Sequence, residues 1–568
     1  MKQKHTIDPG NESRVNLHYA YGFGNLLHPK YSILCLLSVA SSCTSEKNTP
    51  KPPNIICIVC EDISPLLGCY GDTVALTPNI DKLASEGVLF TNMFSVSGVC
   101  APSRHALTTG MYPSGTGGNN MRTSAKRRVA NMPDSLQIIP YECTPPPHVK
   151  CYTEFLRKAG YYCTNNDKED YQFNAPKAAW DESGRNATWK NRPEGMPFFA
   201  IFNLIRTHES QVFNWLDEPE IISPDSVNLP PYYPDTYAIR RDIAQVYTNI
   251  TIMDREVGEL IDELEQANLL DETIIIFYSD NGGPLPRGKR EILDSGLKVP
   301  FMIRFPGKEN AGTVVSDLCS FVDIPPTILS LAGIEVPEYM NGKAFWGDQK
   351  SEPREYIFAA RDRMDEWFDC RRAVRDKNFK YIRNYRPEFP AYMDLEYRKG
   401  LKSMQELLVM RDSGLLNEDQ MYWFRKTKDS DELYDLKNDP FELHNIASKP
   451  EYSVELERLK KVMDLWLQQI DDKGLRFYNE IDLVKNMWPG MVQPETLSPE
   501  IKINKNEAFI SSDTEGASIV YQINHKGYTP NHWFIYSEPF SVNQGDTVSA
   551  LAHRIGYKES VVMEVINP

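Results

Sequence analysis

Apolar runs of strand length recur along the chain and constrain its fold more than any other feature. The first is Asn54–Cys60, and three more follow at 198–205, 273–279 and 299–305. Unbroken apolar runs of this length are typical of strands that are buried on both faces of a sheet. The segment 238–270 carries apolar residues at helical spacing. Alternating buried strands and helices predict an α/β fold, a doubly wound mixed sheet with helices on both faces.

Changes in the pattern of apolar, charged and turn residues divide the chain further. Residues 53–350 are predicted to form the large α/β domain, and residues 351–490 a smaller α+β subdomain with many exposed charges on its strands. Residues 497–568 contain short apolar runs separated by turn residues, which predicts a small β-sandwich resembling chitobiase-type C-terminal modules. Residues 1–52 form an upstream segment, a signal and a tether.

A short apolar run near the N-terminus predicts export. Tyr31–Ala40 follows Lys30 and precedes two serines and Cys43. The run is too short to span a bilayer, which takes about 20 apolar residues. The order of cation, apolar run, small residues and cysteine resembles a bacterial lipoprotein signal. We therefore expect a periplasmic or cell-surface protein that touches a membrane only through a lipid on Cys43; the alternative is a core strand with an incidental cysteine.

Acidic residues directly follow two of the apolar runs. Glu61 and Asp62 come after the first run, and Asp280 and Asn281 come after the third. In an open α/β sheet the carboxyl ends of the strands line the ligand crevice, so these four side chains can converge. Three carboxylates and an amide form an oxygen-only set, which Ca²⁺ or Mg²⁺ prefers. Taken singly, each pair also suits a turn or a helix cap.

The sharpest local motif is Cys100-Ala101-Pro102-Ser103-Arg104. Pro102 suits the first turn of a helix that Gly110 ends, which places Cys100 at the helix N-terminus, where free N–H groups attract anions. A thiol at such a position is expected to have a lowered pKa. The alternative is a buried structural cysteine.

This motif resembles the C-x-P-S-R core of the type I sulfatases, which depend on formylglycine. Segments such as EDISPLLGCYGD, YSDNGG and ELYDLKNDP resemble the same family, in order, from about residue 53 to 450. The resemblance implies an alkaline-phosphatase-like fold, a Ca²⁺ ion (Mg²⁺ as the alternative), and oxidation of Cys100 to formylglycine by a sulfatase-maturing enzyme. It implies that the metal ligands are Glu61, Asp62, Asp280 and Asn281, and that the catalytic residues are Cys100, Arg104, Lys168, His208 and Lys289.

Two positions depart from the family pattern. Glu61 stands where the family usually has Asp, which puts its direct ligation of the metal in question. Asp170 stands where the family's K-x-H element, here beginning at Lys168, has its histidine, so proton handling near Lys168 is open.

The resemblance also implies a sulfated saccharide as substrate. It is strongest to heparan N-sulfatases, which favours N-sulfoglucosamine, with an O-sulfate of another glycan as the alternative. The candidate sugar contacts are Asp170, Arg361, Asp365, Glu366, Arg371 and Arg372. The arginines among them suit the carboxylates and sulfates of a glycan, because their planar fork can bind such groups bidentately. A surface ion-pair network is the other interpretation of the last five.

The overall charge of -16 argues against nucleic-acid binding by a global basic field. An anionic substrate then requires a locally cationic pocket. Two other functions stay open: a phosphatase or phosphodiesterase of the alkaline phosphatase superfamily, and a glycan-binding lipoprotein without catalysis. Only His105, His148 and His208 lie between residues 53 and 350, which disfavours the two zinc sites that such phosphatases use.

Overall fold

The computed structural model describes residues 51–123, 140–213, 220–477, 479–529 and 531–568. The predicted signal and Cys43 lie outside these ranges, so the lipoprotein assignment stays a prediction. Within them, no helix has the length and apolar character needed to cross a membrane.

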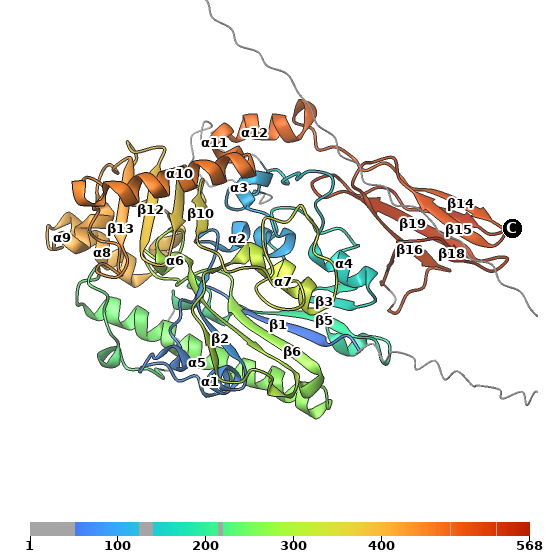
Figure 1. Ribbon diagram of the computed structural model, residues 1–568, viewed down its shortest axis with the longest axis horizontal. Coiled ribbons are helices and arrows are strands. Elements are labelled where there is room, and N and C mark those ends of the chain that lie inside the picture. Colours follow the sequence, from blue (N-terminus) through green and yellow to red (C-terminus); the bar gives the residue numbers. More distant parts are fainter. Residues whose placement is uncertain (1–50, 124–139, 214–219, 478, 530) are drawn as a thin grey trace, which may run out of the picture. The chain divides into compact units, whose positions relative to one another are not determined.

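A mixed sheet forms the centre of the α/β region, as predicted (Figure 1). Its strands lie in the order β4-β3-β5-β1-β6-β7-β2-β8, and β9 pairs with β2. All pairs are parallel except those that β7 makes with β6 and β2. The strands are β1 Asn54–Cys60, β2 Val88–Phe94, β3 Tyr162–Asn166, β4 Glu182–Ser183, β5 Phe198–Leu204, β6 Thr273–Ser279, β7 Lys298–Arg304, β8 Thr313–Val315 and β9 Cys319–Ser320.

Helices cover both faces of this sheet. The side chains of β1 alternate between two hydrophobic cores, with Ile55 and Cys57 in one and Ile56 and Ile58 in the other. Helices α1 and α5 pack on the second core, and α2, α4 and α7 on the first (Figure 1). The helices of this region are α1 Pro78–Ser85, α2 Cys100–Thr109, α3 Pro113–Thr116, α4 Tyr152–Lys158, α5 Tyr237–Gln266, α6 Asp294–Leu297 and α7 Ile324–Leu331.

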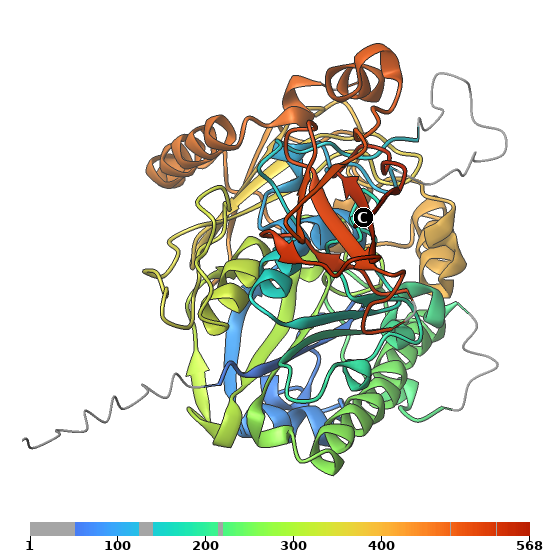
Figure 2. The ribbon, with the colours of Figure 1, turned by 90° about the vertical axis from the view of Figure 1, so that its right-hand side faces the viewer.

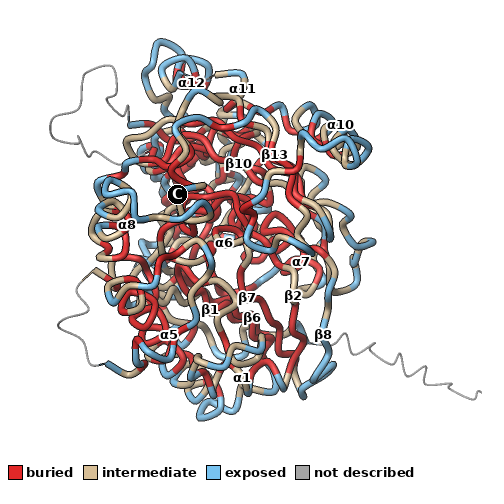
Figure 3. Tube along the Cα trace, turned by 90° about the vertical axis from the view of Figure 1, so that its left-hand side faces the viewer, coloured by how far each residue is buried: buried red, intermediate tan, exposed pale blue. Residues whose placement is uncertain are grey.

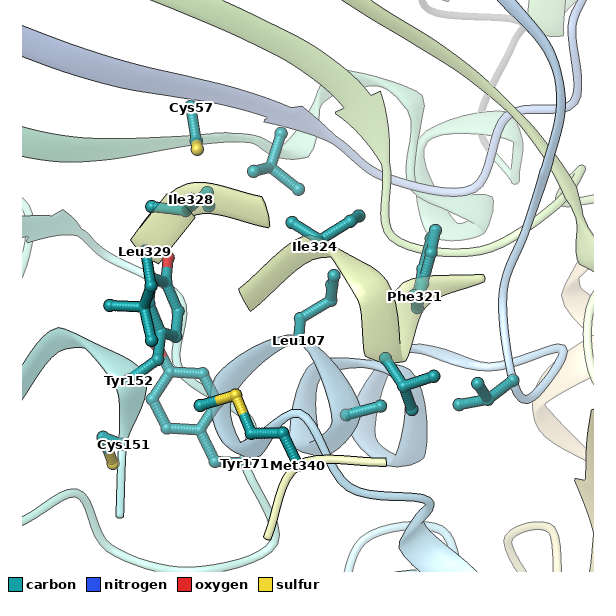
Figure 4. Packing of buried hydrophobic residues seen from close by; sticks show 14 of the residues in the cluster. Cys57, Leu107, Cys151, Tyr152, Tyr171, Phe321, Ile324, Ile328, Leu329 and Met340 are labelled. Carbon is teal, nitrogen blue, oxygen red and sulfur yellow. The ribbon is translucent and has the colours of Figure 1, made fainter. Parts of the chain in front are cut away.

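Close packing fixes α2, which carries the cysteine motif, against the sheet. Figure 4 shows Leu107 of α2 next to Ile324 of α7, in the same core as Cys57 of β1. Buried residues, red in Figure 3, make up most of β1, β6 and β7 at the centre of the sheet. The position of the motif is therefore determined by the two-sided burial that the apolar runs predict.

The region after residue 356 contains a second, antiparallel sheet in the order β10-β11-β12-β13. Its strands are β10 Ile357–Arg361, β11 Arg371–Arg375, β12 Phe379–Asn384 and β13 Asp431–Asp435. The helices that accompany it are α8 Lys402–Asp412, α9 Glu418–Met421, α10 Ser453–Ile470, α11 Lys473–Arg476 and α12 Glu480–Met487.

The charges on these strands are buried, contrary to the expectation of exposed ones. Arg361, Arg371 and Arg372 are almost fully inaccessible to solvent. Arg372 Nε lies 2.6 Å from Asp472 Oδ2, and Arg361 Nη2 lies 2.8 Å from Asp369 Oδ2. Arg371 likewise pairs with Glu432 at 3.2 Å. These arginines therefore form buried ion pairs and not a surface network, since a charge in the interior needs a partner with fixed geometry. Their contact with a sugar stays a prediction.

Two further antiparallel sheets follow residue 499, and both contribute to one hydrophobic core, as a β-sandwich requires. One has the order β14-β15-β18 and the other β17-β16-β19-β20; they are red in Figures 1 and 2. Their bounds are β14 Glu500–Asn504, β15 Glu507–Ser511, β16 Ser518–Ile523, β17 Phe534–Ile535, β18 Phe540–Ser541, β19 Thr547–His553 and β20 Met563–Ile566. The domain boundaries themselves stay predictions.

Candidate active site

Four neighbouring parallel strands end at one edge of the main sheet, and a predicted site residue follows each. Lys168 follows β3, His208 follows β5, Glu61-Asp62 follows β1, and Asp280-Asn281 follows β6. The last residue of β1 is in register with the last residues of β5 and β6. The sheet therefore brings these side chains together, as the positions of the two acidic pairs predicted.

The acidic residues contact one another directly. The backbone N–H of Asp62 donates to Asp280 Oδ1 at 3.3 Å, and Asn281 Nδ2 donates to Asp62 Oδ1 at 3.0 Å. Glu61 joins them through Lys168, whose Nζ lies 2.8 Å from Glu61 Oε2 and 3.7 Å from Asp280 Oδ2. Asp62 holds a left-handed backbone conformation, with φ 51°. Such a conformation costs about 1–3 kcal/mol in a residue other than glycine and is common at functional sites.

Buried cations neutralise these carboxylates. Lys289 Nζ lies 2.5 Å from Asp62 Oδ2, and Arg104 Nε lies 2.9 Å from Asp280 Oδ2. Burial disfavours the charged form of Asp62, but Lys289 and then His208 outweigh it and lower the pKa of this carboxyl. Burial likewise disfavours charged Lys289, whose pKa is nevertheless raised by Asp62 and Glu209.

The chemistry of this cluster fits a hard divalent cation. Its donors are all oxygen atoms, and Asn281 Oδ1 is buried without a hydrogen-bond partner. As the side chains stand, no group of three His, Cys, Asp or Glu residues in the described ranges is arranged to hold a metal. Lysines and Arg104 contact the carboxylate oxygens instead, so a cation held by Glu61, Asp62, Asp280 and Asn281 would replace part of those ion pairs.

Cys100 begins helix α2, which ends at Gly110 with φ 70°, as the motif predicted. The thiol is 2% exposed. Burial raises its pKa to about 12, more than the nearby charges of Lys168 and Lys289 lower it. The expected lowering of this pKa by the helix N-terminus is therefore wrong, because desolvation of the thiolate dominates.

Other residues of the motif hold Cys100 in place. Ser103 Oγ donates to the carbonyl of Ser97 at 2.8 Å, which fixes the loop before the helix. Arg104 Nη1 donates to Asn203 Oδ1 of β5 at 2.6 Å, whereas Arg104 Nη2 is buried without a hydrogen-bond partner. Arg104 is thus anchored on two sides and keeps one donor free for an anion.

His208 lies at the rim of the cluster. Its Nε2 is 3.9 Å from Glu61 Oε2 and 4.0 Å from Asp62 Oδ2, and its Nδ1 is 2.8 Å from Ser210 Oγ. Burial and the charge of Lys289 lower the pKa of His208. Asp170 is half-buried with φ 55°, and its charge acts on Cys100.

A chain of ion pairs that the sequence did not predict extends from this cluster. The N–H of Glu209 donates to Asp62 Oδ2 at 2.8 Å, and its carboxylate accepts from Arg290 at 2.7 and 2.8 Å. Arg290 Nε lies 2.9 Å from Asp365 Oδ2, and Arg122 Nε lies 3.7 Å from Asp365 Oδ1. Although burial opposes it, Arg290 lowers the pKa of Glu209 to about 2. Asp365 was expected to contact sugar; no sequence motif marked Arg122.

The larger cavities in the described part of the chain are not lined by Cys100. One of about 780 Å³ is lined by Trp180, Arg185 and Trp533, among others. Another of about 440 Å³ is lined by residues that include Tyr232 and Phe441. The chemistry is therefore located by the convergence of strand ends rather than by the size of a cavity.

Comparison with known proteins shows which proteins this chain resembles. Residues 53–334 match the family described as Sulfatase, and residues 287–407 match the C-terminal family of N-sulphoglucosamine sulphohydrolase. An ulvan-active sulfatase of Formosa agariphila is 46% identical over 92% of this chain and 92% of its own length. Human N-sulphoglucosamine sulphohydrolase is 24% identical over 80% of this chain and 96% of its own. The solved structure of a 2-O GAG sulfatase matches 75% of this chain and 94% of its own, with TM-score 0.56 and 20% identity.

Proposed function

Because this chain belongs to the sulfatase family, we propose that it removes sulfate from a sulfated carbohydrate at the cluster around Cys100. The observation that carries this proposal is the convergence of Cys100, Lys289 and Arg104 on the oxygen donors at the ends of β1 and β6. Its relatedness to the Formosa sulfatase, over nearly the whole of both chains, supports the same reaction class.

The chain's own residues bind and orient the sulfate group. The free Nη2 of Arg104 and the ammonium groups of Lys168 and Lys289 can donate to its oxygens, in a buried site where such contacts are stronger than in water. His208 would give a proton to the departing oxygen or nitrogen through Nε2–H, since its Nδ1 accepts from the N–H of Ser210 and its lowered pKa favours the neutral ring. Formylglycine at position 100 would supply a nucleophilic oxygen, and a divalent cation on Glu61, Asp62, Asp280 and Asn281 would supply positive charge.

For the substrate, we propose the sulfate of ulvan or of a polysaccharide with similar chemistry. The support is the 46% identity with an ulvan-active sulfatase. N-sulfoglucosamine, which the sequence favoured, is the second candidate; it is supported by the C-terminal family match and by a relative of 24% identity.

Sulfate release from defined saccharides tests both candidates. Protein co-expressed with a sulfatase-maturing enzyme is expected to release sulfate from ulvan oligosaccharides, and less from N-sulfoglucosamine saccharides. Cys100→Ala is expected to abolish release. Cys319→Ala is a matched control, because Cys319 is also 2% exposed and lies in β9. Full activity of Cys100→Ala would contradict the assignment of the nucleophile.

A phosphatase remains a weaker alternative. In the described ranges His105 is buried in the core and bonded to the carbonyl of Tyr171, so His208 is the histidine at the cluster. One histidine is too few for a pair of catalytic zinc ions. Faster hydrolysis of an aryl phosphate than of the matching aryl sulfate would favour this alternative. Oligosaccharide binding that Cys100→Ala leaves unchanged, without sulfate release under any condition, would instead indicate a glycan-binding protein without catalysis.

Export is part of the proposal. We propose that the chain is a lipoprotein acylated at Cys43 and held at the periplasmic or outer surface of a membrane. Palmitate labelling that depends on Cys43 tests this assignment.

A further inference from the structure

We propose that Arg122 forms an anion-binding subsite beside the reacting sulfate, which takes a carboxylate or a second sulfate of the substrate. This inference rests on the proposed function, since it concerns the non-reacting part of a sulfated saccharide. Arg122 ends the ion-pair chain of Glu209, Arg290, Asp365 and Arg122, which the backbone N–H of Glu209 links to Asp62.

The Arg122 guanidinium is held loosely. Its Nε lies 3.7 Å from Asp365 Oδ1, beyond hydrogen-bond distance, and its side chain is 32% exposed. It also lies over the ring of Tyr397, 5.7 Å from the centroid. Among the described residues these are its side-chain partners, so its terminal N–H groups remain available to a ligand.

Asp365 is better satisfied by Arg290 than by Arg122. Its other oxygen, Oδ2, lies 2.9 Å from Arg290 Nε. Arg290 in turn is buried and doubly bonded to Glu209. Because Asp365 shares its charge between two arginines, Arg122 keeps positive charge that an incoming anion can meet.

Arg122 is also close to the nucleophile. Its neighbour Met121 packs in the same hydrophobic cluster as Cys100. The N–H of Arg290 donates to the carbonyl of Gly98 at 2.5 Å, which ties the ion-pair chain to the loop before Cys100. Burial opposes the charged form of Arg122, but Asp365, Cys100 and Asp170 outweigh it and raise its pKa.

Three residues of this ion-pair chain have a strained backbone conformation. Arg122, Arg290 and Asp365 have φ 55°, 74° and 48°, values that residues other than glycine seldom adopt. Backbone strain of this kind clusters at ligand sites.

The exposed fractions of the side chains around Cys100 indicate the side from which a substrate enters. Cys100, Asp62 and Asp280 form a buried floor. Lys168 at 23% and Arg122 at 32% are the more exposed cations around it. A saccharide that enters past these cations would bring a second anionic group to Arg122, whose planar fork suits a carboxylate or a sulfate.

Binding and turnover of paired saccharides test the subsite. One pair consists of a sulfated oligosaccharide with a uronate and its carboxyl-reduced form; the other consists of a disulfated saccharide and its monosulfated counterpart. Arg122→Gln and Arg122→Lys are compared with Arg386→Gln. Arg386 is a matched control, because its side chain is also 32% exposed, pairs with Glu388 and lies over Phe389.

We expect Arg122→Gln to lower kcat/KM about 10–100-fold for at least one doubly anionic substrate, mainly through KM, and less than about 3-fold for its counterpart. Arg122→Lys should lose part of this effect, and Arg386→Gln should lose none of it. The pair that responds identifies the second group as a carboxylate or a sulfate.

The same comparison by calorimetry in the Cys100→Ala background separates this inference from the proposed reaction. Loss of discrimination on Arg122→Gln supports the subsite even if turnover fails. Equal binding of both members of each pair, or an equal loss for both, would overturn the subsite. Absence of sulfate release from every saccharide by the matured wild type, by contrast, would overturn the proposed function.

Discussion

Cys100 in its unmodified form should be almost inert as a thiol at neutral pH. Burial raises its pKa to about 12. An ordinary cysteine, with a pKa of about 8.5, is roughly one-quarter thiolate near pH 8, whereas a thiol of pKa about 12 is ionised in about one molecule in ten thousand. The reactive population is therefore smaller by about three orders of magnitude.

Alkylation measures this population directly. Protein made without a maturing enzyme and treated with a chelator is exposed to iodoacetamide near pH 8, and modification at Cys100 is followed by peptide mass spectrometry. The same residue in urea-unfolded protein is the control. We expect the folded rate to be at least about a thousand times lower, because the thiolate is rarer and the sulfur is inaccessible.

Rapid labelling of folded protein would refute this reasoning. It would mean that the helix N-terminus and the two lysines control the thiol more than burial does. The same argument predicts that the unmodified protein has no sulfatase activity, since the buried thiol cannot serve as the nucleophile itself. Turnover by protein whose peptide mass shows an intact thiol at position 100 would contradict that statement.

Four further results are expected. Lys289→Met should lower kcat about 100-fold or more, measured with a saccharide substrate, because it removes a buried cation from the sulfate site. Arg372→Met should destabilise folding by about 3–5 kcal/mol in urea without raising KM, because it leaves Asp472 buried and unpaired. Asp181→Asn should expose the linker near residue 495 to proteolysis, because Asp181 Oδ1 accepts from His532 of the β-sandwich at 2.6 Å. Chelation should abolish turnover, and Ca²⁺ should restore it.

The contribution of Asp181 has a definite pH dependence. Burial opposes its charged form, but Arg157 outweighs it and lowers the pKa of Asp181. A lowered carboxyl pKa stabilises the fold above the unfolded value of 3.8, and this stabilisation is lost as the pH falls through the lower, folded value. Asp181→Asn and wild type should therefore converge in stability in strong acid.

A raised KM in Arg372→Met would instead support the interpretation that Arg372 contacts the sugar.

The ends of β1 and β6 were predictable, because in each case an apolar run that must be buried is followed directly by acidic or amide residues. Cys60 and Ser279 had to be buried as the ends of apolar runs, so the acids after them had to meet at one edge. The strand before Lys168 was not predictable in this way. Its sequence, Tyr162-Cys-Thr-Asn-Asn166, is short and half polar, and the polar side chains are satisfied by neighbours such as Asn203.

Burial of charge was the main feature that the sequence could not supply. Arg361 and Arg371 look like surface residues until their partners, Glu291 and Glu432, are brought to them from distant parts of the chain. The pKa of Cys100 was misjudged for the same reason, because a helix N-terminus is visible in the sequence but the depth of its burial is not. Arg122 was missed because its role depends on Asp365 and Arg290, which only the fold places beside it.

The charges around the nucleophile change the account of how an acidic protein accepts an anionic substrate. The sequence predicted a cationic pocket, but among the described residues the ion-paired side chains carry five negative and five positive groups. The acids are Glu61, Asp62, Glu209, Asp280 and Asp365, and the cations are Arg104, Arg122, Lys168, Lys289 and Arg290. These charges leave no excess of positive charge to attract sulfate, and the protein as a whole repels it. One divalent cation makes the local sum of charges positive, so the metal should be needed for the binding of sulfate as well as for its release.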